Sequence, residues 1–266
     1  MLISLILGLV IGVILALTGA GGGILAVPLL VFGVGIGVAE AGPIGLLAVG
    51  LAASLGAVLG LRAGIVRYRA AALIAGAGML VSPAGLWLAR QVDNRWLSIV
   101  FAVVLLYVAF NTYRKAKGVT GESDPALGQS PPCIRENERG RFIWTRPCAR
   151  ALSLSGLVAG LLSGLLGVGG GFVMVPALQR YTDLAMQSIV ATSLATIALI
   201  SAAGVVTSAA SGELNWAIAL PFASGAIAGM LAGRALSSRL AGAYLQIGFA
   251  AVSALVAAGM IGKALF

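Results

Sequence analysis

The chain has 266 residues, of which 60% are hydrophobic and only 9% carry a charge. A soluble domain has roughly 25% charged residues, so this composition excludes a soluble globular protein and predicts an integral membrane protein in contact with the lipid bilayer. The formal net charge of +9 does not indicate nucleic-acid binding, because the Lys and Arg residues fall at the ends of apolar segments and in one polar loop.

The first apolar segment, residues 2–17, has no basic start and no small-residue cleavage site, so we expect it to remain as a membrane segment rather than a signal peptide. A glycine cluster and a short apolar piece, 24–38, follow it. The further apolar segments predict helices over 40–61, 70–88, 96–113, 151–166, 186–210, 214–231 and 241–265, with a second short piece ending near 180–183.

A polar linker, 114–150, separates the apolar segments into two groups. It contains eight Lys or Arg residues and four acidic residues, which favours a cytoplasmic position. Both cysteines of the chain, Cys133 and Cys148, lie in this linker, 15 residues apart and without a Cys-x-x-Cys motif. We interpret them as ordinary loop thiols.

One stretch occurs twice. Residues 8–30 match residues 156–178 at a constant offset of 148, with 12 identities in 23 positions, where this composition gives roughly two or three by chance. The shared motif is Gly-x-Gly-Gly-Gly-x-x-x-Val-Pro, beginning at Gly19 and at Gly167. We therefore divide the chain into an N-terminal transmembrane repeat (1–113), the linker (114–150) and a C-terminal transmembrane repeat (151–266).

Each glycine cluster predicts a break in a membrane helix, and the proline five residues after its last glycine predicts a second discontinuity. Backbone freed inside a bilayer must line a cavity or be buried in protein, and paired broken helices mark the substrate site of many transporters. Amides at such a break, together with the helix dipole, bind an oxyanion without a buried cation.

The predicted fold is therefore an all-α polytopic membrane protein of two homologous repeats with broken helices, with about eight membrane-embedded segments or more. Whether the halves are parallel or inverted follows from the basic residues. If each half crosses the membrane an even number of times, the halves are parallel and 12 Lys and Arg residues lie on one side of the membrane with 5 on the other. If each half crosses an odd number of times, the halves are inverted and the numbers are 13 and 3, with Arg180 set aside. The odd number obeys the positive-inside rule better, so we prefer inverted halves.

The candidate substrate-binding residues combine both glycine clusters with nearby hydroxyls. They are Thr18, Gly19, Gly21, Gly22, Gly23, Gly167, Gly169, Gly170, Gly171, Thr192 and Ser193. The alternative for glycines is close helix packing, which we prefer for Gly8, Gly12, Gly156 and Gly160. The alternative for hydroxyls, including Thr196, is a hydrogen bond back to their own helix.

The paired motifs, the segment spacing, the basic linker and the Ala-Thr-Ser-Leu of residues 191–194 together resemble the sulfite exporter TauE/SafE family of bacterial membrane transporters. The resemblance covers nearly the whole chain. It implies movement of small sulfur-containing or carboxylate anions across the bacterial inner membrane. The family often has a Thr-Ser pair in both halves, whereas the first-half equivalents of Thr192 and Ser193 here are Ile44 and Gly45. We therefore expect an asymmetric site, with these hydroxyls in the second half alone.

We therefore expect a secondary transporter of sulfite, sulfoacetate or related sulfonates. The alternatives are a passive anion channel and a transporter of carboxylates without sulfur. An enzyme is not expected, because His is absent and no cofactor, metal or catalytic site is recognisable. Glu40 could bind a coupling proton, although an interfacial cap fits its position better. The coupling ion, the direction of transport and the oligomeric state stay open.

Overall fold

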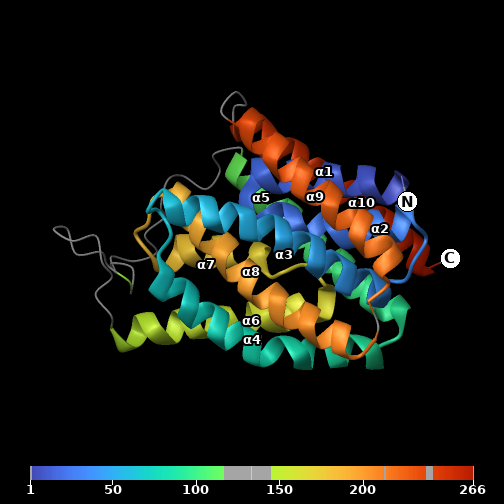
Figure 1. Cartoon of the computed structure of the whole chain (residues 1–266), viewed down its shortest axis with the longest axis horizontal. Coiled ribbons are helices and arrows are strands. Elements are labelled where there is room, and N and C mark those ends of the chain that lie inside the picture. Colours follow the sequence, from blue (N-terminus) through green and yellow to red (C-terminus); the bar gives the residue numbers. More distant parts are fainter. Residues whose placement is uncertain (1, 117–132, 134–144, 213, 238–241, 266) are drawn as a thin grey trace.

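The computed structural model describes residues 2–116, 133, 145–212, 214–237 and 242–265, and Figure 1 shows their arrangement. Over these residues the chain is helical, with one isolated backbone bridge and no strand. The elements are α1 (Leu2–Thr18), the 3₁₀ helix η1 (Gly19–Leu25), α2 (Ala26–Gly33), α3 (Val38–Arg62), α4 (Tyr68–Gln91), α5 (Asn94–Ala116), α6 (Arg146–Leu166), α7 (Gly171–Tyr181), α8 (Met186–Ala210), α9 (Trp216–Ser237) and α10 (Gly242–Leu265).

Six of the described helices, α3, α4, α5, α6, α8 and α9, are long and apolar enough to cross a membrane. Three shorter apolar helices cover residues 2–18, 22–33 and 247–263. Because a bilayer core requires about 20 helical residues, these lengths confirm the prediction of an all-α, multi-pass membrane protein. Eight or more embedded segments would require the shorter helices to enter the bilayer too, and that number stays a prediction. Most of the predicted linker, including Lys117, Arg135, Arg139 and Arg141, lies outside the described residues.

Two of the long helices, α3 and α6, begin with a backbone N–H that donates to a side-chain oxygen. The backbone N–H of Val38, at the start of α3, donates to Oδ1 of Asn94 over 2.7 Å. The hydroxyl of Thr145 accepts from the N–H of Cys148 at the start of α6. Such caps satisfy donors that have no partner within the helix itself.

The predicted second discontinuity at the motif prolines is wrong for the second half. Helix α7 continues through Pro176, which lies inside it. A proline removes one backbone hydrogen bond, and here that loss does not end the helix. In the first half, Pro28 lies in the first turn of α2, where the N–H has no helical partner in any case.

The molecule has two end faces, visible at the two ends of the long axis in Figure 1. We call one the linker face, because the starts of α6 and α8 and the turn between α3 and α4 lie there. A hydrogen bond from the N–H of Arg67 to the hydroxyl of Thr192 joins the start of α4 to α8 at this face. We call the other the terminal face. There Lys263 near the C-terminus contacts the carbonyl of Val31, and Arg90 contacts Ser211.

Glycines bring helices of the two halves into close contact. A Cβ added to Gly8 in α1 would overlap the carbonyl oxygen of Phe222 in α9, and one added to Gly12 would overlap that of Ala226. Because both residue numbers rise together, α1 and α9 are parallel. The packing interpretation of Gly8 and Gly12 is thereby confirmed.

The same arrangement joins α6 to α4. A Cβ on Gly156 would overlap the carbonyl oxygen of Ile74, and a Cβ on Gly160 would overlap that of Gly78. These contacts confirm the packing interpretation for the second pair of glycines as well.

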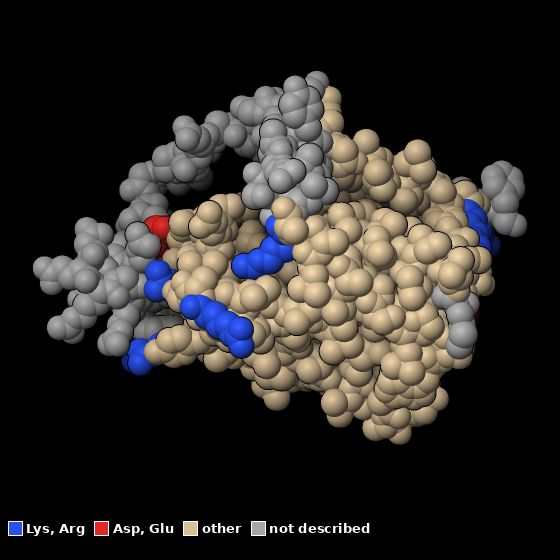
Figure 2. All heavy atoms as spheres, turned by 45° about the horizontal axis from the view of Figure 1, so that its top comes forward, with Lys and Arg blue, Asp and Glu red and all other residues tan. Residues whose placement is uncertain are grey.

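Helices α3 and α8 lie at the centre of the molecule and are antiparallel to each other. Gly50 contacts Ser201 and Gly60 contacts Ala191, so one residue number rises as the other falls. In each of these two helices 61% of the most apolar window is buried, compared with 33% to 44% in the other four long helices. The outer helices expose apolar side chains such as Leu80, 82% exposed. The face drawn in Figure 2 has its Lys and Arg residues toward the two ends, with a broad uncharged surface between them. This distribution suits a bilayer around the middle.

Candidate functional site

The second glycine cluster forms an open turn between α6 and α7. Gly167, Gly169 and Gly170 have φ angles of 70°, 75° and 71°, a region that side-chain-bearing residues rarely adopt. The N–H of Gly167 donates to the carbonyl of Ser163, which closes the end of α6. Helix α7 then starts at Gly171, and all of these glycines are buried. The helix therefore breaks at the position of the motif.

The first glycine cluster forms a tighter winding. Residues Gly19–Leu25 are a 3₁₀ helix between α1 and α2. A Cβ on Gly22 would lie 2.8 Å from the backbone of Leu15 and 2.7 Å from the hydroxyl oxygen of Thr18, so the chain packs directly against the end of α1. The two copies of one motif thus have different backbone conformations.

The two breaks meet at the middle of the central helices. A Cβ added to Gly23 would lie 3.0 Å from Cγ1 of Val49 and 3.3 Å from the carbonyl oxygen of Val168. A Cβ added to Gly169 would lie 3.4 Å from the same Val49 atom and 2.8 Å from Ile197. Val49 and Ile197 each lie near the midpoint of their helices, α3 and α8. The breaks therefore lie together at mid-depth, far from both end faces.

Two half-helices begin at this meeting point. Helix α2 starts at Ala26 and runs toward the terminal face, whereas α7 starts at Gly171 and runs toward the linker face. In the first turn of α7 the backbone N–H groups of Val173 and Met174 both donate to the carbonyl of Gly170. The N-terminus of α7, with its partial positive charge, therefore lies at this point, whereas α2 continues directly from η1, since the N–H of Ala26 donates to the carbonyl of Gly23.

The C-terminal end of α6 also lies near the breaks. Gly167, at the C-terminus of α6, packs against Gly42 and Gly45 of α3. Gly42 lies seven residues before Val49, which is about 10 Å along a helix. Gly45, whose added Cβ would lie 2.9 Å from the carbonyl oxygen of Gly167, is one helical turn before Val49, and the carbonyl oxygen of Val168 lies 3.3 Å from the Cβ position of Gly23. Carbonyl oxygens as well as the start of α7 therefore lie near this point.

The predicted hydroxyls do not all reach the breaks. The hydroxyl of Thr18 donates to the carbonyl of Ile14 over 2.7 Å, and that of Thr196 donates to the carbonyl of Thr192 over 3.0 Å. Both are bonds back to their own helix, the alternative stated for them. The hydroxyl of Thr192 accepts from the backbone N–H of Arg67 over 3.0 Å and so caps the start of α4. Ser193 is fully buried and its Oγ has no protein partner.

Sequence reasoning missed Ser201 of α8. Its Oγ lies 3.0 Å from where a Cβ on Gly169 would be, is fully buried and has no hydrogen-bond partner. A signal was present, because Ser201 and Ser193 are eight residues apart and lie on the same side of one helix. Ser201 is thus a polar side chain in contact with the second break.

Glu40 and Arg62 lie at opposite ends of α3, and both are exposed. Glu40 is in the first turn, where a carboxylate interacts favourably with the helix dipole, and Arg62 is in the last turn, where a cation does. These positions support helix-end roles for both residues.

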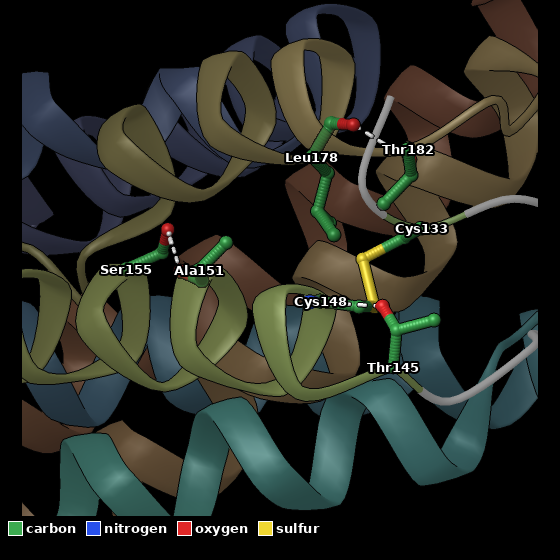
Figure 3. The surroundings of a disulfide bond; sticks show 7 residues. All are labelled: Cys133, Thr145, Cys148, Ala151, Ser155, Leu178 and Thr182. Carbon is green, nitrogen blue, oxygen red and sulfur yellow. Dashed lines mark hydrogen bonds between the residues drawn. A yellow bond between two sulfur atoms is a disulfide. The ribbon is translucent and has the colours of Figure 1, made fainter. Parts of the chain in front are cut away.

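The interpretation of the cysteines as ordinary thiols is wrong. Cys133 and Cys148 form a disulfide with a Cα–Cα distance of 5.0 Å, and both are fully buried (Figure 3). The backbone N–H of Cys133 donates to the carbonyl of Tyr181 at the end of α7, and Cys148 lies in the first turn of α6. Cys133 therefore connects the start of α6, through the disulfide, to the end of α7, through the backbone hydrogen bond. Sequence spacing alone does not reveal that Cys133 returns to α7.

An apolar hollow lies on the surface between the starts of α1 and α9. Leu2, Leu5 and Trp216 are among the side chains that line it. It is near the terminal face and away from both breaks, so its chemistry suits lipid rather than an anion.

The model of the family "Sulfite exporter TauE/SafE" matches residues 4–260. The chain is 29% identical over 235 residues to a "Probable membrane transporter protein" of Xylella fastidiosa (strain Temecula1), a match that covers 88% of this chain and 83% of that protein. It is 26% identical over 257 residues to the "Probable membrane transporter protein YunE" of Bacillus subtilis (strain 168), covering 90% and 89%. No solved structure matches the chain.

Proposed function

Since the chain belongs to the sulfite exporter TauE/SafE family, we propose that it is a secondary transporter that moves sulfite, sulfoacetate or related sulfonates across the bacterial inner membrane. That it is a membrane transporter and not an enzyme follows from the family and from the relatives. The anion and the inner membrane are the proposed parts.

The observation that carries the anion proposal is the meeting of the two glycine breaks at mid-depth. Gly23 and Gly169 both contact Val49, and the half-helices α2 and α7 start beside them. Backbone amides at the N-terminus of α7 can donate to oxygens of an anion. A sulfite or sulfonate group has three such oxygens, and glycine permits their close approach.

We propose further that the two halves are inverted repeats. Support comes from equivalent contacts at the offset of 148 residues: Gly8 contacts Phe222 in the same way as Gly156 contacts Ile74. Helix α1 starts at the terminal face, whereas its counterpart α6 starts at the linker face. In transporters with inverted repeats, one half rocks against the other around a fixed central site.

The burial of the breaks favours a transporter over a passive channel. Gly22 and Gly23 in the first break and the glycines from Gly167 to Gly171 in the second are all buried. A site closed on both sides must open to one side at a time, as alternating access requires.

The test is uptake into proteoliposomes that contain the purified protein, with sulfite, thiosulfate, sulfoacetate, taurine and simple carboxylates as substrates. We expect transport of sulfite or a sulfonate that continues against a gradient when a proton or ion gradient is supplied. Empty liposomes are the control. Transport of carboxylates alone would contradict the sulfur-anion proposal, and flux that only dissipates gradients would indicate a channel.

A further inference from the structure

Among the described hydroxyls of α8, those of Ser193 and Ser201 are buried without a partner. The hydroxyls of Thr207 and Ser208 donate to the carbonyls of Ala203 and Gly204 on their own helix, each over 2.9 Å. Hydroxyls in membrane helices commonly make such bonds. Among the described residues Ser82, Ser163 and Ser253 of other helices are also buried without a partner, so the position of Ser201 at the second glycine break is what distinguishes it.

Ser201 is directed at the second glycine break. Its Oγ lies 3.0 Å from the Cβ position of Gly169, and its own Cβ lies 2.8 Å from the Cβ position of Gly50 on α3. Because both neighbours are glycines, they place no side chain between the hydroxyl and the backbone of the second break. The neighbouring side chains in this contact, Val49 and Ile197, are apolar and fully buried. A hydrogen bond donated in such surroundings is stronger than one in water.

Ser193 does not share this position. It precedes Ser201 by eight residues, which corresponds to about 12 Å along the helix. A small anion held at Gly169 therefore cannot bind both hydroxyls at once, and the geometry selects Ser201.

We propose that Ser201 donates a hydrogen bond to the anion at the glycine breaks and selects sulfite and sulfonates over carboxylates. This inference rests on the proposed function. Backbone amides at the start of α7 bind two oxygens, which both classes of anion have. The Ser201 hydroxyl binds the third oxygen, which a carboxylate lacks. A site that donates to a group missing from a competitor discriminates strongly against that competitor.

The experiment compares Ser201→Ala with the matched control Ser208→Ala, which removes a buried hydroxyl of the same helix that bonds only to its own backbone. Both changes remove one oxygen atom and add no bulk, so both variants are expected to fold. Affinities for sulfite, sulfoacetate and acetate are measured by calorimetry on purified protein in detergent. Proteoliposome uptake is measured in parallel.

We expect Ser201→Ala to weaken sulfite and sulfoacetate binding by about 10- to 150-fold, the range for a lost hydrogen bond to a charged group. Acetate binding should change much less, and Ser208→Ala should match the wild type. Unchanged sulfite affinity in Ser201→Ala, with a wild type that binds and transports sulfite, would overturn this inference and leave the transport function standing. A wild type that binds none of the sulfur anions would overturn both.

Discussion

At the scale of single residues, the glycines fall into two classes that their neighbours distinguish. Those in the α1–α9 and α4–α6 contacts lie against carbonyl groups of the partner helix. Gly167, Gly169 and Gly170 instead have positive φ angles in a buried turn. The first class is required for assembly, whereas the second is required for the conformation of the break.

We predict that Gly170→Val abolishes transport while the protein still inserts into the membrane. A valine at a φ of 71° is strained, and its Cβ would lie 2.7 Å from the carbonyl oxygen of Ala159. Gly22→Val should behave likewise, because its Cβ would lie 2.8 Å from Leu15. The matched control is Gly76→Val in α4, where a Cβ meets nothing within 4 Å. Sulfite uptake and membrane-fraction yield are measured, and normal uptake by Gly170→Val would reassign the cluster to packing.

Thr192→Val should affect stability rather than anion binding. Its hydroxyl caps the start of α4 through the N–H of Arg67, and loss of such a cap costs about 0.5–2 kcal/mol. We expect a lower Tm with sulfite affinity retained, compared with Thr207→Val as the control. A large loss of affinity at unchanged Tm would instead support Thr192 as a substrate ligand.

At the scale of elements, the disulfide joins the outer ends of a broken hairpin. Cys148 is in the first turn of α6, and Cys133 pairs with Tyr181 at the end of α7. The bond (Figure 3) therefore restrains the outer end of the α6–α7 hairpin, whereas the glycine turn lies at its other end.

We predict that Cys148→Ser lowers the Tm. A sequence separation of 15 residues corresponds to about 3 kcal/mol of stabilisation when the chain-entropy estimate is applied. Cys133→Ser should have the same effect, and the wild type in strong reductant should match both variants. Thermal unfolding of purified protein measures this, and an identical Tm in all four samples would show that the bond does not contribute to stability.

At the scale of the whole molecule, two rules disagree about which side of the membrane the linker face lies on. Arg180 ends α7 beside the linker face, so it adds to the basic excess there and leaves Arg90, Arg95 and Lys263 on the terminal face. The positive-inside rule therefore favours the cytoplasm. A disulfide, in contrast, persists in oxidising compartments. We retain the cytoplasmic proposal, because the basic excess involves several loops, whereas the disulfide is a single bond.

Reporter fusions after the C-terminal helix α10 test this orientation, since Lys263 lies at the terminal face. We expect a fused alkaline phosphatase to be active and a fused green fluorescent protein to be dark, because the terminal face would be periplasmic. A bright fluorescent fusion would place the linker face outside, where the disulfide is stable.

The sequence by itself determined the membrane class, the approximate helices, the helix break at Gly167 and the packing glycines such as Gly8. These follow from hydropathy, helix propensity and residue size, which act over a few neighbouring residues. Only the tertiary structure decided that Thr192 caps α4, that Ser201 faces Gly169 and that Cys133 pairs with Cys148. Each of these depends on the residue that lies opposite, brought there by helices distant in the chain, and no local pattern encodes that contact.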